Sequence, residues 1–197
     1  MTIAQTTHAG ILTYRMATID DKELLLDFRK ECGWGGPKIL EYLGNPDRPF
    51  CVFILSKDNG EKTEVGMGGW ALDMIDDQET ASRKHRIVYL SSLFIRKAYQ
   101  ASGLGSRAVD ILEKVAIEIY NAKTLTLDTT AYHTYIDEDG WLIEDTERQG
   151  KNWSWYERRG YREYREPRPQ FPHPSATDPG RKLQGVFLRR HVTSCEK

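Results

Sequence analysis

Residues 87–95 read Ile-Val-Tyr-Leu-Ser-Ser-Leu-Phe-Ile, and this run is apolar on both faces of an extended chain. Such a strand is typical of the middle of a sheet that is covered on both sides. If the apolar residues before and after the serine pair share a face, one extra residue is inserted at Ser91-Ser92 and forms a β-bulge. A regular strand without the insertion fits the pattern nearly as well, so both interpretations remain open.

Other segments predict a mixed fold around this strand. Apolar residues at three-and-four spacing predict a helix from Ser106 to Tyr120, directly after the strand. The turn Lys57-Asp58-Asn59-Gly60 between two apolar runs predicts a β-hairpin. The expected strands are 11–16, 50–56, 64–74, 87–95, 124–129, 161–165 and 183–191, and the further expected helices are 21–29, 38–43 and 152–159.

The composition excludes several classes of protein. Of 197 residues, 39% are apolar and 29% are charged, with no repeat or low-complexity run, which excludes disordered, collagen-like, coiled-coil and solenoid chains. The length predicts one domain over 1–197, with a flexible start at 1–10 and insertions at 131–150 and 166–182. No apolar run approaches the roughly 20 residues that cross a bilayer. The three cysteines lie far apart without metal-binding spacing. We therefore expect a cytoplasmic protein with no metal and no membrane partner.

A loop with two glycines, Gln100-Ala101-Ser102-Gly103-Leu104-Gly105-Ser106, lies between the strand at 87–95 and the helix that follows it. Because Gly103 and Gly105 have no side chains, a phosphate group can approach the backbone closely. The N–H groups of the helix's first turn and the positive end of its dipole favour an anion there. The spacing is neither that of a Walker loop nor the three-glycine dinucleotide fingerprint, and an ordinary turn is the alternative interpretation.

Two segments resemble the GNAT superfamily of N-acetyltransferases. The first is residues 90–105, where a strand of aliphatic residues is followed by Gln-x-x-Gly-x-Gly and a helix. The second is residues 152–161, which combine an aromatic residue, Tyr156, a charged pair and a Gly-Tyr ending. The order of the two segments and the strand between them also agree with the family.

The resemblance implies an α/β (α+β) fold, with a mostly antiparallel sheet of about seven strands that is flanked by helices on both faces. It implies a splay between the strands at 87–95 and 124–129, where acetyl-CoA enters. The pantetheine arm would lie along the backbone of Leu93, Phe94 and Ile95, and would also contact Asn152. Asn152 can instead cap the helix 152–159, which Gly160 ends. The implied pyrophosphate contacts are Gln100, Ala101, Ser102, Gly103, Leu104, Gly105 and Ser106.

The resemblance also implies catalytic roles. Tyr156 matches the tyrosine that donates a proton to the departing coenzyme A thiolate, while core packing of its ring is the alternative. Many family members carry a glutamate base where this sequence has Tyr89, so we assign the base to Asp128, with a water chain or an acidic residue of 131–150 as alternatives. A backbone N–H near Leu93 or Phe94 would stabilise the oxyanion.

Three aromatic residues are expected to border the acceptor. These are Trp34, Tyr89 and Trp141. The acidic residues of 131–150 would attract a cationic amine, or else keep an exposed hairpin soluble. His85 and His133 lack companions at metal-ligand spacing, so they are interpreted as surface histidines.

The sequence therefore predicts an N-acetyltransferase that moves an acetyl group from acetyl-CoA to the primary amine of a small molecule or amino acid. Direct attack in a ternary complex is expected, because neither Cys32 nor Cys51 lies in an activated setting. The expected partner is a small-molecule amine and not nucleic acid, since the arginines of 158–168 alternate with glutamates. A monomer or homodimer is expected. The alternatives are a protein N-terminal or lysine acetyltransferase and a non-catalytic module that binds coenzyme A.

Overall fold

The computed structural model describes residues 10–33, 36, 38–138, 142–172 and 182–192. The chain divides into two compact units, Met1–Lys123 and Thr124–Lys197, which are considered one at a time. In the described residues the first unit holds four strands of one sheet, and the second holds a set of three strands and a separate two-stranded hairpin, with antiparallel pairing inside each unit. This confirms the predicted mixed fold with a mostly antiparallel arrangement of seven strands. The single domain over 1–197 stays a prediction, and residues 1–9 of the expected flexible start lie outside the described residues.

The first unit follows the predicted order of elements, with small differences at their ends. β3 leaves the sheet earlier than predicted, because the N–H of Leu72 bonds the carbonyl of Asp47 and that of Met74 bonds Ala81. The first helix runs past its predicted end at Arg29 and stops at Gly33, whose φ is 83°. The elements are β1 (Ile11–Met16), η1 (Ile19–Asp21), α1 (Lys22–Cys32), α2 (Lys38–Tyr42), β2 (Phe50–Ser56), β3 (Lys62–Ala71), β4 (Ile87–Ile95), η2 (Lys97–Tyr99) and α3 (Leu104–Glu118).

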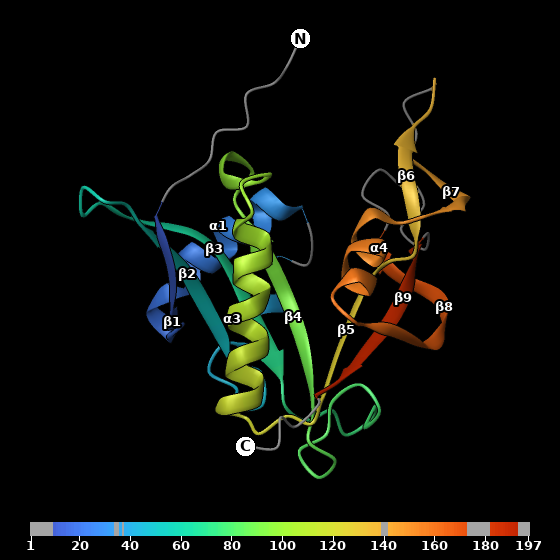
Figure 1. Cartoon of the computed structure of the whole chain (residues 1–197), viewed down its shortest axis with the longest axis horizontal. Helices are drawn as coiled ribbons and strands as arrows, with labels where there is room; N and C mark the ends of the chain where they lie inside the picture. The colour runs from blue at the N-terminus through green and yellow to red at the C-terminus, as the bar shows by residue number, and fades with distance from the viewer. Residues whose placement is uncertain (1–9, 34–35, 37, 139–141, 173–181, 193–197) are drawn as a thin grey trace. The chain divides into compact units, whose positions relative to one another are not determined.

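Helices cover both faces of the first unit's sheet. On one face Met67 of β3 is buried in a cluster with Phe28 of α1 and Phe94 of β4. Trp70 is three residues further along β3 and therefore points to the opposite face. There its indole Nε1 donates to the carbonyl of Leu112 on α3 at 3.0 Å, and Figure 1 shows α3 lying along this sheet. The strand β4 is thus packed on both sides, as its apolar pattern predicts.

The connection between β1 and α1 depends on one buried carboxylate. Asp21 accepts hydrogen bonds from Arg15 at 2.6 and 2.7 Å and from the backbone N–H of Thr18 at 2.8 Å. The Arg15 guanidinium, acting mainly through these hydrogen bonds, lowers the pKa of Asp21 to about 2.

We expect Asp21→Asn to lower the free energy of unfolding at pH 7 by about 1.5 kcal/mol, because a hydrogen-bonded charge is lost. Since the pKa in the folded chain lies below the unfolded value of 3.8, the contribution is present above pH 4 and disappears as the pH falls toward 2. Urea unfolding at several pH values measures this difference. Asp20→Asn, at the exposed neighbouring position, is the control; an equal loss there, or a difference that persists at pH 2, contradicts the assignment.

The second unit has a three-stranded sheet in the order β5 (Thr124–Thr130), β9 (Lys182–His191) and β8 (Arg162–Pro172), counted over its described residues. A hairpin of β6 (Tyr132–Ile136) and β7 (Leu142–Gln149) follows β5, and the helix α4 (Lys151–Arg158) follows the hairpin. The hairpin occupies the segment that the sequence marked as an insertion. β8 extends beyond the predicted end at Arg165 because its prolines lie in an edge strand, where missing N–H groups are tolerated.

Candidate functional site

The start of α3 leaves backbone N–H groups without helical acceptors beside open space. Gly103 is the residue before the helix, has φ 80° and, within the described chain, leaves the first turn with no side-chain cap and no acidic residue. The first helical N–H that bonds back is that of Arg107, to the carbonyl of Gly103 at 3.3 Å. The N–H groups of residues 104–106 therefore have no acceptor within the helix. A Cβ built at Gly103 or Gly105 meets no described atom within 4 Å, so the space beside this backbone is open.

The loop before α3 holds its own shape. Gln100 donates through its side-chain amide to the carbonyl of Ile95 at 2.8 Å, and the hydroxyl of Ser102 donates to the carbonyl of Tyr99. Ala101 has φ 59°, so the chain takes a left-handed turn there as well as at Gly103. Leu104 is fully buried and contributes only its backbone to the open side. The predicted contact residues thus form a short loop, 100–103, and the first turn of α3, 104–106, and their contact with a ligand stays a prediction.

Charged contacts fix the end of β4 to α1. The Arg96 guanidinium bonds Asp27 and Glu31, each at 2.7 Å, and lies 4.5 Å over the ring of Phe28. The backbone N–H of Lys97 donates to the second oxygen of Glu31 at 2.7 Å. The loop that precedes α3 therefore starts from a fixed point.

The central strand β4 carries the bulge that the sequence left open. Gly69 pairs with Ser91 and Met67 pairs with Phe94, so the single Gly68 lies opposite two residues of β4. Ser92 has φ 56°, which marks the extra residue. The bulged interpretation is confirmed, and the regular strand is wrong. A bulge leaves a peptide group outside the ladder, and here it does so beside Leu93.

Tyr156 lies on α4 in an aromatic setting. Its side chain is only 9% exposed, and its ring centroid lies 4.7 Å from that of Trp155 and 5.6 Å from that of Tyr161. These contacts fix the ring, as the packing alternative requires. The same contacts would also hold a catalytic phenol in position, so the catalytic role of Tyr156 stays a prediction.

Asn152 does not cap α4, and that prediction is wrong. The helix starts at Lys151, and its N-cap is Gly150, with φ −61° and ψ 142°. A residue with a side chain could not approach β5 as closely as Gly150 does, since a Cβ at this position would lie 2.6 Å from the carbonyl oxygen of Thr130. Asn152 is consequently an exposed residue of the first turn.

The other predicted residues fall in different places. Asp128 is half-buried on β5 and accepts a hydrogen bond from the side-chain amide of Gln170 at 3.0 Å. Tyr89 is half-buried on β4 opposite Ala71. Trp34 and Trp141 lie outside the described residues. The structure brings Leu93, Phe94, Ile95 and the loop 100–106 together in the first unit, and Asp128, Asn152 and Tyr156 all belong to the second.

Sequence reasoning missed one charged residue near Tyr89. Arg29 is half-buried on α1, and burial lowers the pKa of its guanidinium, while Cys32 and Tyr89 act in the opposite direction. The helical pattern of α1 gives no signal for this, because Arg29 directly follows the core residue Phe28.

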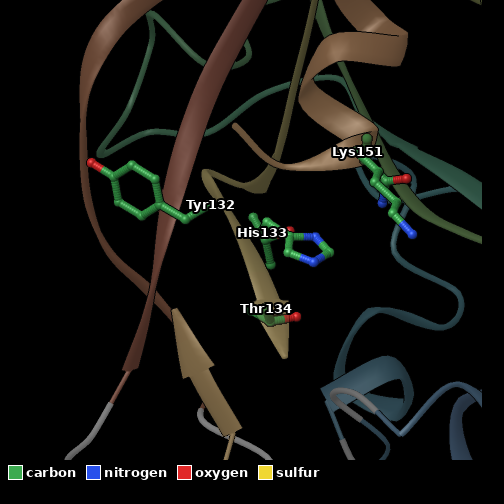
Figure 2. A pocket seen from close by; sticks show the side chains of 6 residues that line it. Tyr132, His133, Thr134 and Lys151 are labelled. Atoms are coloured by element: carbon green, nitrogen blue, oxygen red, sulfur yellow. The ribbon is translucent and has the colours of Figure 1, made fainter. Parts of the chain in front are cut away.

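A cavity of about 270 Å³ in the second unit was also missed. Figure 2 shows His133 of β6 and Lys151 of α4 on the same side of β6, with the ring of Tyr132 on the other side of that strand. His133, expected to be a surface or loop histidine, lies on β6, is partly exposed and lines this cavity. The cavity is lined by Thr130, Tyr132, His133, Thr134, Lys151 and Asn152.

Two other kinds of feature are absent from the described residues. No three His, Cys, Asp or Glu side chains gather there as ligands for a metal ion. No helix in the same residues combines the length and apolar character needed to cross a bilayer.

Comparison with known proteins points to one family. The family model described as "Acetyltransferase (GNAT) family" matches residues 19–136. No curated protein sequence matches the chain at a significant level.

Solved structures share the fold at low sequence identity. Spermidine N-acetyltransferase from Vibrio cholerae in complex with CoA and spermine has 13% identity and a TM-score of 0.60, over 91% of this chain and 95% of that one. An aminoglycoside 6'-N-acetyltransferase complexed with coenzyme A has 17% identity and a TM-score of 0.56, over 91% and 97%. IAA acetyltransferase from Bacillus cereus has 10% identity and a TM-score of 0.56, over 92% and 100%.

Proposed function

The chain belongs to the acetyltransferase (GNAT) family, and we propose that it transfers an acetyl group from acetyl-CoA to the primary amine of a small molecule or amino acid. Family membership confirms the predicted resemblance and the acyltransferase class. Two of the similar structures are N-acetyltransferases of spermidine and of aminoglycosides, and both contain coenzyme A. These likenesses support an amine as acceptor and acetyl-CoA as donor.

The observation that carries the proposal is the backbone at the start of α3. Three N–H groups without helical acceptors, a left-handed glycine and open space beside it fit the oxygens of a pyrophosphate. A side chain at Gly103 would occupy that space. The loop residues 100–106 would therefore hold acetyl-CoA mainly through main-chain atoms, and the peptide group left out of the ladder near Leu93 would bond its pantetheine arm or the oxyanion.

The nitrogen of the protonated amine loses two protons in all, and the sulfur gains one. The amine loses the first proton before attack, and its nitrogen then forms a bond to the acetyl carbonyl carbon. The nitrogen loses the second proton from the tetrahedral intermediate, and this proton replaces the one that Tyr156 gives to the sulfur. As the tetrahedral intermediate collapses, the carbon–sulfur bond breaks and the sulfur leaves as a thiolate. The hydroxyl of Tyr156 donates a proton to that sulfur, since a phenol with an unperturbed pKa near 10 can assist a thiolate of about 8.5.

Direct transfer agrees with the setting of the buried cysteine. Cys51 is fully buried, and burial raises the pKa of its thiol to about 12. The thiolate needed for a covalent acetyl intermediate does not form there near neutral pH. Attack by the amine in a ternary complex requires no such intermediate.

Asp128 is the proposed base, and Asp128→Asn tests it. We expect kcat/KM for the amine at pH 7 to fall about 100-fold, because the carboxylate no longer accepts the amine's proton. The loss should shrink as the pH approaches 10, where an alkyl amine is already deprotonated in solution. Steady-state rates between pH 6 and 10 measure it, with Gln170→Leu as the control that removes only the hydrogen-bond donor. A normal rate at pH 7 contradicts the assignment and favours a water chain.

Thiol release from acetyl-CoA across a panel of amines tests the function as a whole. Release that depends on a small-molecule amine supports the proposal. Release with peptides alone would favour a protein acetyltransferase, and acetyl-CoA binding with no release would favour a non-catalytic module.

A further inference from the structure

The cavity beside α4 offers hydrogen-bond donors and positive charge. Lys151 contributes an ammonium group, His133 an imidazole and Asn152 an amide, and Thr130 and Thr134 each carry a hydroxyl. None of the six described residues that line it carries a carboxylate. Figure 2 shows the His133 and Lys151 side chains on the same side of β6. Such a lining suits an anionic oxygen group.

The backbone adds to this preference. The N–H of Gly150 bonds the carbonyl of Ala131 at 2.8 Å, which brings the start of α4 against the β5–β6 connection. Over the described chain, α4 begins without a side-chain cap. The positive end of the helix therefore lies at the cavity, where it reinforces the charge of Lys151.

Glu144 and Asp145 of the neighbouring hairpin each have a partner outside the six residues that line the cavity. Glu144 accepts a hydrogen bond from the backbone N–H of Gln184 at 2.8 Å. Asp145, which pairs with His133 across the hairpin, accepts from the N–H of Glu147 at 3.2 Å and lies 3.8 Å from the Arg148 guanidinium. Asp145 lies across the hairpin from His133, so its negative charge opposes an anion at the cavity, while the charge of Lys151 and the start of α4 favour one.

One residue of the cavity lining lies one helical turn before the proposed catalytic acid. Asn152 lines it, and Tyr156 is four residues later on α4, so both side chains share one face of the helix. A small molecule that contacts Asn152 would therefore lie about one helical turn from Tyr156. The volume of about 270 Å³ suits a molecule of amino-acid size.

We propose that this cavity binds a carboxylate of the acceptor through Lys151 and His133, so that the acceptor is an amino acid or a similar amine that also carries an acid group. This inference rests on the proposed acetyl transfer. It narrows the acceptor from any small primary amine to one with both charges, and it excludes a purely cationic amine as the preferred substrate.

Matched acceptors and a matched variant test the inference. For an amino acid that the chain acetylates, kcat/KM should exceed that for its carboxamide at least tenfold. In Lys151→Gln, kcat/KM for the amino acid should fall about tenfold. The value of kcat/KM for the carboxamide and the KM for acetyl-CoA should stay unchanged. Lys182→Gln, an exposed lysine on β9, should change neither. Equal loss for both acceptors, or a raised KM for acetyl-CoA in Lys151→Gln, overturns the proposal.

A binding measurement separates the cavity from the reaction. Inorganic phosphate is titrated into the chain at constant ionic strength without acetyl-CoA, while the NMR signals of the His133 imidazole are followed. We expect these signals to shift to saturation, and Lys151→Gln to raise the dissociation constant at least fivefold while Lys182→Gln does not. Unmoved His133 signals overturn the anion site. Phosphate binding with this pattern, but no acetyl transfer to any amine, contradicts the proposed function and not the site.

Discussion

Tyr156→Phe is expected to lower kcat about 100-fold, because loss of a positioned general acid typically costs a factor of 100 or more. The phenylalanine ring can keep the contacts with Trp155 and Tyr161, so the fold of α4 should be retained. The dissociation constant for acetyl-CoA should remain within about twofold, since the lost interaction acts on the departing sulfur and not on the bound thioester. Steady-state rates together with calorimetric titration of acetyl-CoA measure both quantities.

The control for this variant is Tyr164→Phe on β8, which removes a hydroxyl from a half-buried tyrosine of the same unit. It should leave kcat near the wild-type value. An unchanged kcat in Tyr156→Phe removes that residue from the mechanism. A raised dissociation constant with normal kcat assigns Tyr156 to cofactor binding or packing.

Gly103→Val is expected to raise the dissociation constant for acetyl-CoA about 30-fold, which corresponds to about 2 kcal/mol. Gly103 has φ 80°, and a β-branched residue is strained in this left-handed region. The loop relieves the strain by turning away, and this moves the N–H groups of the first turn. The valine side chain also fills the open space that the phosphate oxygens would occupy.

Gly60→Val separates strain from binding. Gly60 has φ 83° in the turn between β2 and β3, and a Cβ there also meets no described atom within 4 Å. Both variants should lose similar stability in urea unfolding, but only Gly103→Val should lose affinity for acetyl-CoA. Equal affinity in the two variants contradicts the role of the loop.

The sequence predicts best where local pattern and packing agree. The apolar run of β4 is buried on both faces, and its two serines mark the bulge at Ser92. The α3 pattern likewise predicts a helix whose inner face carries Leu112. Both elements contribute buried residues to the core of the first unit, where packing and periodicity give the same answer.

Prediction fails where distant segments decide the structure. The N-cap of α4 is Gly150, because a glycine there allows close contact with Thr130, twenty residues earlier. The intrinsic preference of asparagine for the N-cap position therefore does not decide where α4 begins. Prolines like those of β8 would break a strand in the middle of a sheet, but they are tolerated in an edge strand. The edge position of β8 depends on its pairing with β9, which local sequence does not show.

The candidate site shows the same division. The segment 100–106 is local, so its glycines and the helix after it were sufficient to predict a close turn before α3, and its binding of an anion stays a prediction. The cavity at His133 and Lys151 is formed by a strand and a helix that are separated by β7. Neither residue has a motif around it, and only the folded chain brings them together.

The most direct test of the central claim is an NMR titration of the chain with acetyl-CoA, following the backbone amide signals of Gly103, Gly105 and Ser106. We expect these three signals to move to saturation with about one acetyl-CoA per chain, while the signal of Gly60 does not move. If acetyl-CoA leaves the three amide signals in place, or binds while shifting only signals elsewhere in the chain, the start of α3 is not its pyrophosphate site.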